Sequence, residues 1–137
     1  MVIKFNMKLN LKSFWPGVIW FLLSCVAFFL PGAALPDNDW FGKIELDKII
    51  HVGLFAVMVL LWCVPLFQKP AFTSRIPSLL IAIPFAFFGY SVLVEFIQHF
   101  FIPGRSFDLA DILADALGCG VGFVFVKLYQ RSRPDVQ

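Results

Sequence analysis

Four long runs of hydrophobic residues, divided by short polar, proline- or glycine-containing stretches, dominate this chain of 137 residues. Each run approaches the roughly 20 helical residues that are needed to cross a hydrocarbon core of about 30 Å. None of them alternates between apolar and polar residues, as the elements of a small soluble domain would. We therefore predict an all-α integral membrane protein with four transmembrane helices, at approximately residues 14–35, 49–67, 76–101 and 109–129.

The composition agrees with this fold class. Hydrophobic residues make up 60% of the chain and charged residues only 15%, which excludes an ordinary soluble domain. The four helices leave little chain over, so we expect one membrane domain over residues 1–137. The net charge of +2 comes from scattered basic residues next to the apolar runs, so we expect the lipid bilayer as a partner and no nucleic acid.

The distribution of lysine and arginine predicts the orientation, because cytoplasmic loops carry the excess of these residues. If the N-terminus is cytoplasmic, eight of the eleven basic residues are cytoplasmic and three are external. Both termini are then cytoplasmic, and most of the acidic residues face the other side. The external basic residues are Lys43, Lys48 and Arg105.

The first hydrophobic run has an alternative interpretation as a cleaved signal peptide. Three lysines precede it, and the small residues Gly32-Ala33-Ala34 follow it. The run is long for a signal peptide, however, and further spans follow, so we favour a transmembrane helix. Either alternative leaves the other three helices with the same orientation.

Polar side chains gather at one end of three of the predicted helices. Charges beside or within lipid-spanning helices are costly, so they mark a functional or structurally indispensable site. Spacings of three or four residues place the members of each stretch on one face of their helix. The stretches contain Asp47 and His51; Glu95, Gln98 and His99; and Asp108, Asp111 and Asp115.

The last hydrophobic run combines acidic residues with a stripe of small ones. Ala114, Gly118 and Gly122 are spaced four apart and permit close helix packing, and Asp111 and Asp115 extend the same side of the helix. Counted from Lys127 at the inner end, Asp115 lies about 18 Å up the helix, as the deepest charge. We expect this carboxyl group to be either protonated or paired.

Two cations can reach the acidic side chains. Arg105 follows the turn at Pro103-Gly104 and can fold back over the acids, and its planar guanidinium suits a carboxylate or a phosphate. Lys48 adjoins Asp47 but points about 100° around the helix, so its place in the site is weaker.

In these residues the chain resembles the VanZ-like family of small bacterial membrane proteins. The resemblance covers about residues 47–122, and the ordered combination of motifs is more specific than any one of them. Where the family pattern usually has Asn, this chain has Asp115, which adds an acid at the deepest point. The motifs are Asp47-Lys48-Ile49-Ile50-His51 followed by Phe55, Glu95-Phe96-Ile97-Gln98-His99, Pro103-Gly104-Arg105-Ser106-Phe107-Asp108 and Asp111-Ile112-Leu113-Ala114-Asp115-Ala116-Leu117-Gly118.

The resemblance implies a multi-pass protein of the bacterial inner (cytoplasmic) membrane. The founding member of the family is linked to low-level resistance to the glycopeptide teicoplanin. Glycopeptides act outside the cytoplasmic membrane, on the side to which the charge distribution assigns the polar stretches.

We expect these stretches to form one outward-facing pocket that binds an envelope lipid or amphiphile. A network that only locks the helix ends together is the alternative without a ligand. The predicted pocket residues are Asp47, Lys48, His51, Glu95, Gln98, Arg105, Asp108, Asp111 and Asp115.

Three further interpretations remain open. In a membrane-embedded enzyme acting on a lipid-linked or cell-envelope substrate, His51 or His99, oriented by Glu95 or Asp111, would be the general base. The same four residues could hold zinc or manganese, but their spacing matches no known zinc motif, so we expect no cofactor. Proton-coupled transport is disfavoured because the inner halves of the second and fourth helices offer almost no ionisable residue.

Overall fold

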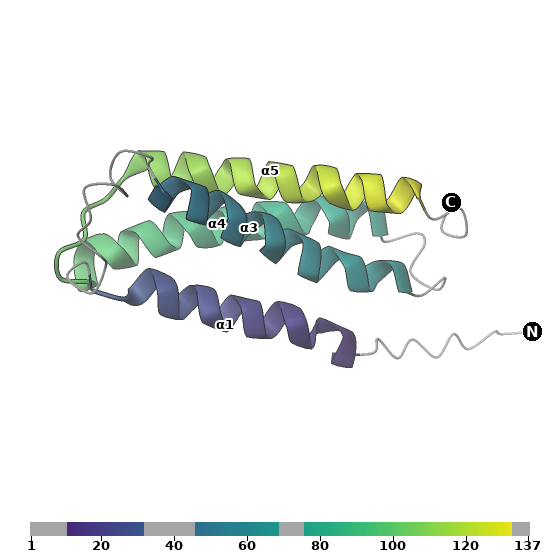
Figure 1. The fold of residues 1–137 in the computed structure, drawn as a ribbon, viewed down its shortest axis with the longest axis horizontal. Helices are drawn as coiled ribbons and strands as arrows, with labels where there is room; N and C mark the ends of the chain where they lie inside the picture. The colour runs from purple at the N-terminus through teal and green to yellow at the C-terminus, as the bar shows by residue number, and fades with distance from the viewer. Residues whose placement is uncertain (1–10, 32–45, 69–75, 133–137) are drawn as a thin grey trace, which may run out of the picture.

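The computed structural model describes residues 11–31, 46–68 and 76–132 and places them in a bundle of four long helices (Figure 1). A short 3-10 helix, Leu11–Phe14, leads into α1, Trp15–Phe29. Helix α3 spans Leu46–Cys63 and continues as a 3-10 helix, Val64–Gln68. Helices α4 and α5 span Ile76–Phe101 and Leu109–Arg131.

Successive helices run in opposite directions, so α1 starts and α5 ends at the same end of the bundle (Figure 1). Four helical stretches are long and apolar enough to cross a membrane, beginning with Leu11–Phe29. The predicted fold class is confirmed by these helices. The predicted bounds of α4 agree with the structure, α3 begins three residues earlier than predicted, and α5 ends two residues later. The first predicted helix ends earlier than predicted, at Phe29, because Leu30 is already extended; residues 32–35 of that prediction lie outside the described part of the chain.

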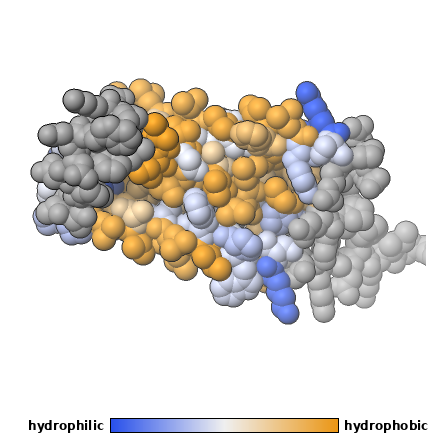
Figure 2. All heavy atoms as spheres, viewed as in Figure 1, coloured by the Kyte–Doolittle hydropathy of each residue, from blue (hydrophilic) through white to orange (hydrophobic). Residues whose placement is uncertain are grey.

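Large hydrophobic side chains lie on the outer surface of the bundle as well as in its core. Phe55, Met58 and Val126 are fully buried, whereas Phe85 and Leu113 are more than half exposed. Figure 2 shows one hydrophobic face, with the strongly hydrophilic residues toward the ends of the bundle. A bundle whose helices are apolar both toward the core and on the outer surface suits a lipid environment.

The closest helix pair is α3 and α5, which make the most extensive contact in the bundle. A Cβ atom added to Gly118 would lie 2.5 Å from the Val52 carbonyl oxygen, and one added to Gly122 would lie 2.6 Å from that of Ala56. The two helix backbones therefore approach at the small-residue stripe. This approach brings the first turns of α5 against those of α3, where the polar side chains lie.

Helix α1 packs against α3 and α4 through fewer contacts. The Trp20 indole N–H donates a hydrogen bond to the Leu54 carbonyl at 3.0 Å, and the Cys25 thiol lies 3.2 Å from the Tyr90 hydroxyl. A side chain at Gly17 would meet the Trp62 ring at 2.9 Å. These contacts hold α1 along its length.

Candidate functional site

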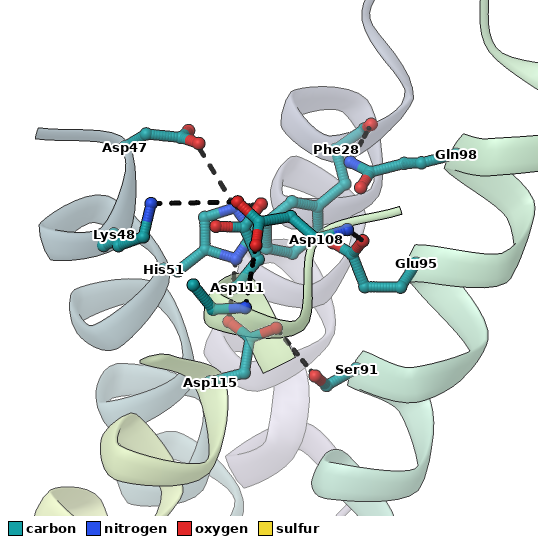
Figure 3. A network of polar contacts seen from close by, with 11 residues as sticks. Phe28, Asp47, Lys48, His51, Ser91, Glu95, Gln98, Asp108, Asp111 and Asp115 are labelled. Carbon is teal, nitrogen blue, oxygen red and sulfur yellow. Dashed lines mark hydrogen bonds and ion pairs between the residues drawn. The ribbon is translucent and has the colours of Figure 1, made fainter. Parts of the chain in front are cut away.

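One group of polar side chains lies where the first turns of α3 and α5 meet the end of α4 (Figure 3). We call this group the polar cluster. Its buried members include His51, Glu95, Gln98, Asp111 and Asp115. The polar cluster consists of Asp47, Lys48, His51, Ser91, Glu95, Gln98, Asp108, Asp111 and Asp115.

Asp115 links three helices at the deepest part of the cluster. Its Oδ1 lies 2.9 Å from His51 Nδ1 on α3, and its Oδ2 accepts a hydrogen bond from the Ser91 hydroxyl on α4 at 2.7 Å. The three residues are at most 2% exposed. Both carboxyl oxygens of this acid therefore have a partner, which offsets much of the cost of burying it.

The other ring nitrogen of His51 faces two carboxyl groups. His51 Nε2 lies 3.9 Å from Asp47 Oδ1, one helical turn earlier, and 4.0 Å from Asp111 Oδ2. Both distances exceed the 2.7–3.2 Å that is typical of N–H···O hydrogen bonds. The Phe28 ring of α1, centred 4.9 Å from the imidazole, closes another side. One nitrogen of this histidine is thus held at hydrogen-bond distance, while the other lies 3.9 Å or more from the two carboxyl groups that it faces.

A second set of contacts joins α4 to the start of α5. The backbone N–H of Asp108 donates to Glu95 Oε2 at 3.0 Å. The Asp108 side chain caps α5 by accepting from the Ala110 backbone N–H at 2.8 Å, and it also pairs with Lys48 at 3.8 Å. Glu95 therefore fixes the turn between the two helices, and Asp108 fixes the beginning of α5.

Two buried carboxyl oxygens have no hydrogen-bond partner in the described part of the chain. They are Glu95 Oε1 and Asp111 Oδ1. Glu95 is 0% exposed and Asp111 is 6% exposed. Buried polar atoms are normally paired, so each such atom calls for an explanation.

Gln98 serves a different purpose within the cluster. Its side-chain amide donates to the Phe28 carbonyl at 2.8 Å, near the end of α1. Carbonyl groups in the last turn of a helix lack an intrahelical partner, and this amide supplies one. Gln98 thereby ties α1 to the cluster.

The structure does not bring two of the predicted site residues into these contacts. His99 is exposed, and its ring contacts that of Phe100 on the same helix, with centroids 4.7 Å apart. Arg105 is partly buried, and its Nε has no hydrogen-bond partner among the described residues. None of the carboxylates in the described ranges lies within 4.0 Å of the Arg105 guanidinium.

Ser91 and Phe28 are the contributors that sequence reasoning missed. Ser91 precedes Glu95 by four residues and so shares its helix face, which could have been recognised from the same spacing rule. Lys48, the weaker candidate by helical angle, reaches Asp108 because α5 begins beside it. No sequence pattern pointed to the backbone carbonyl of Phe28.

The cluster is rich in acid for its buried position. Five carboxyl groups, those of Asp47, Glu95, Asp108, Asp111 and Asp115, accompany the permanent cation Lys48 and the titratable His51. An imidazole oriented by a carboxylate can accept a proton, act as a general base or ligate a metal ion. Accepting a proton needs only His51 and Asp115. Ligating a metal ion also needs further ligand atoms around His51 Nε2.

Beside the cluster a groove runs between α3 and α5, with a volume of about 340 Å³. Its wall is apolar except at one end, where Lys48 lies. The lining residues are Lys48, Ile49, Val52, Ala110, Leu113, Ala114 and Leu117.

Comparison with known proteins supports the resemblance found in the sequence. A fission yeast protein, "Uncharacterized protein C11E3.10" of Schizosaccharomyces pombe, is 29% identical to this chain over 118 residues. The match covers 85% of this chain but 63% of the yeast protein, so the chain spans less than two thirds of that relative. No solved structure matches the chain. The model of the VanZ/LLP1 family matches residues 6–130, and the chain therefore belongs to this family.

Proposed function

We propose that this protein binds an amphiphile at the end of the bundle that carries the polar cluster, on the outer face of the bacterial cytoplasmic membrane. The groove between α3 and α5 carries this proposal. Its apolar wall reaches from Ala110 to Leu117, which is about 10 Å along the helix axis. Lys48 stands at its polar end.

The chemistry of the groove fits a molecule with a negatively charged head and a hydrocarbon tail. The Lys48 side chain is 30% exposed and pairs with Asp108 at 3.8 Å, a distance that leaves its ammonium group able to meet another anion. The exposed side chains of Leu113 and Leu117 offer hydrocarbon contact for a tail. Arg105, in the turn before α5, is the second cation that we assign to the head group.

Binding is tested with the full chain purified in detergent, with phosphatidylglycerol as the probe and uncharged diacylglycerol as the comparison. Native mass spectrometry counts the lipid retained. Lys48→Gln should reduce phosphatidylglycerol retention about ten-fold, equal to about 1.4 kcal/mol. Lys127→Gln, which removes a lysine near the opposite end of the bundle, is the matched control.

A third variant tests the apolar wall separately from the charge. Leu113→Trp fills the groove and should lower retention of both lipids. Equal retention by Lys48→Gln and Lys127→Gln, or no preference for the charged lipid in the wild type, would refute the proposed binding site.

The family resemblance extends the proposal to antibiotic resistance. If the bound amphiphile protects the envelope, expression in a susceptible bacterium raises the teicoplanin concentration that stops growth. The Lys48→Gln variant should lose this effect at equal expression. Unchanged susceptibility with the wild type removes resistance from the proposal.

A second candidate function is catalysis on a lipid-linked envelope substrate. The observation that favours it is the buried hydrogen bond between His51 and Asp115, which leaves Nε2 as a positioned general base. Turnover of a lipid-linked cell-wall precursor, followed by mass spectrometry, should vanish in His51→Gln and persist in His99→Gln. Binding of the precursor without turnover by the wild type would exclude this activity for that substrate.

A further inference from the structure

We infer that Asp47, His51 and Asp111 form a binding site for a divalent transition-metal ion such as Mn²⁺ or Zn²⁺. One ligand atom from each of the three residues lies within 4.8 Å of the others. Asp47 and His51 come from the first turns of α3, and Asp111 comes from the first turn of α5. The site goes beyond amphiphile binding and does not depend on it.

The state of the His51 ring gives the first argument. When Nδ1 donates its proton to the Asp115 carboxylate at 2.9 Å, Nε2 carries a lone pair. That lone pair faces the carboxyl oxygens of Asp47 and Asp111. Three electron-rich atoms that face one another repel unless a proton or a metal ion lies among them.

A proton on Nε2 would serve this arrangement poorly. The two carboxyl oxygens lie 3.9 and 4.0 Å away, which is beyond hydrogen-bond distance from either one. A metal ion fits after a small closure of the site, because ligand bonds of about 2.1 Å at tetrahedral angles place ligand atoms about 3.4 Å apart. The Asp47 side chain, which is 53% exposed, can move inward to complete the set.

The second argument comes from the buried acid. Asp111 is 6% exposed, and its Oδ1 has no hydrogen-bond partner in the described part of the chain. Its other oxygen faces the His51 ring at 4.0 Å (Figure 3). An ion at this point would contact the carboxyl group directly and compensate for its burial.

The third argument is the support behind the histidine. Histidine ligands usually donate their other ring N–H to a carboxylate, which fixes the tautomer and strengthens the nitrogen as a ligand. Asp115 occupies that position, and Ser91 holds Asp115 in turn at 2.7 Å. The structure thus contains a ligand set and the residues that orient it.

The donor set selects the class of ion. One imidazole nitrogen and two carboxylate oxygens suit Zn²⁺ and Mn²⁺ better than Mg²⁺ or Ca²⁺, which prefer oxygen alone. Three protein ligands leave coordination positions open for water or for an oxygen atom of a bound molecule.

The test uses the full chain in detergent, stripped of metal and free of added lipid, titrated with Mn²⁺ and followed by electron paramagnetic resonance. One ion should bind per chain, Zn²⁺ should displace it, and pulsed measurements should detect the nitrogen of His51. Asp47→Asn and Asp111→Asn should each weaken Mn²⁺ binding about ten-fold or more. Asp115→Asn should weaken it by about 10- to 100-fold, as expected for a residue that orients a ligand.

His99→Gln is the matched control and should leave the Mn²⁺ affinity unchanged, because its exposed ring lies outside the ligand set. If the buried Asp111→Asn variant fails to fold, the half-exposed Asp47→Asn variant still decides the question. The inference is overturned if the wild type binds no Mn²⁺ or Zn²⁺, if the nitrogen signal is absent, or if Asp47→Asn binds as the wild type does. Because no lipid takes part, failure of amphiphile binding leaves this result unaffected.

Discussion

Replacing Gly118 by alanine tests the close approach of α3 and α5 that holds the polar cluster together. The added methyl group would lie 2.5 Å from the Val52 carbonyl oxygen and 2.9 Å from Phe55 Cβ. The first of these is a backbone atom, which cannot swing away as a side chain can. The two helices must therefore separate at a point one residue from His51.

The expected cost follows from this geometry. Overpacking a well-packed interior by a methylene group costs about 1–3 kcal/mol. Gly120→Ala is the matched control, because it adds the same group to the same helix where no atom lies within 4 Å. Alanine favours a helix over glycine by about 1 kcal/mol, so the control should be neutral or slightly stabilised. This gain is common to both variants and cancels in the comparison, so they should differ by the overpacking cost alone, about 1–3 kcal/mol in free energy of unfolding.

Unfolding in mixed micelles of dodecylmaltoside and sodium dodecyl sulfate, followed by tryptophan fluorescence and helical circular dichroism, measures this difference. Gly118→Ala should unfold at a lower fraction of sodium dodecyl sulfate than Gly120→Ala. If Gly118→Ala is as stable as Gly120→Ala, the close approach of the two backbones does not exist as described.

Three further variants test individual hydrogen bonds by the same unfolding assay. Ser91→Ala removes the 2.7 Å donor to the buried Asp115 carboxyl group and should cost about 1.5–3 kcal/mol, so an unchanged stability would contradict that bond. Gln98→Met keeps the size of the side chain but leaves the Phe28 carbonyl without its donor, for an expected loss of about 1–3 kcal/mol. Asp108→Ala removes the N-cap of α5 and should cost about 1 kcal/mol. An unchanged stability of this variant would argue against the cap.

The helices could be predicted because each is a long apolar run, and α4 matches its predicted bounds. Helix α3 begins earlier than predicted because Asp47 and Lys48 are polar and fall outside the apolar run, although they are helical. The apolar pattern also could not show that this helix changes to 3-10 geometry from Val64 onward. Polar residues in the first turn hide the start of a helix from a prediction based on hydrophobicity. A change from α to 3-10 geometry does not alter the hydrophobicity of the sequence.

Helical spacing also predicted that acids and His51 from different helices share one end, but it could not choose between neighbouring residues. Gln98 and His99 are adjacent and point about 100° apart, so both fit the spacing rule relative to Glu95. The structure turns Gln98 inward and leaves His99 exposed. This choice depends on how α4 is rotated against its neighbours, which a pattern along one helix does not contain.

The two hydrogen bonds of Asp115 also bear on the order in which the bundle assembles. Helix α5 is the last of the described helices to be synthesised, yet its carboxyl group is the partner of His51 on α3 and of Ser91 on α4. Until α5 enters, those two groups have no such partner, and lipid offers no water in exchange. Insertion of α5 therefore completes the pairing of polar groups contributed by α3 and α4.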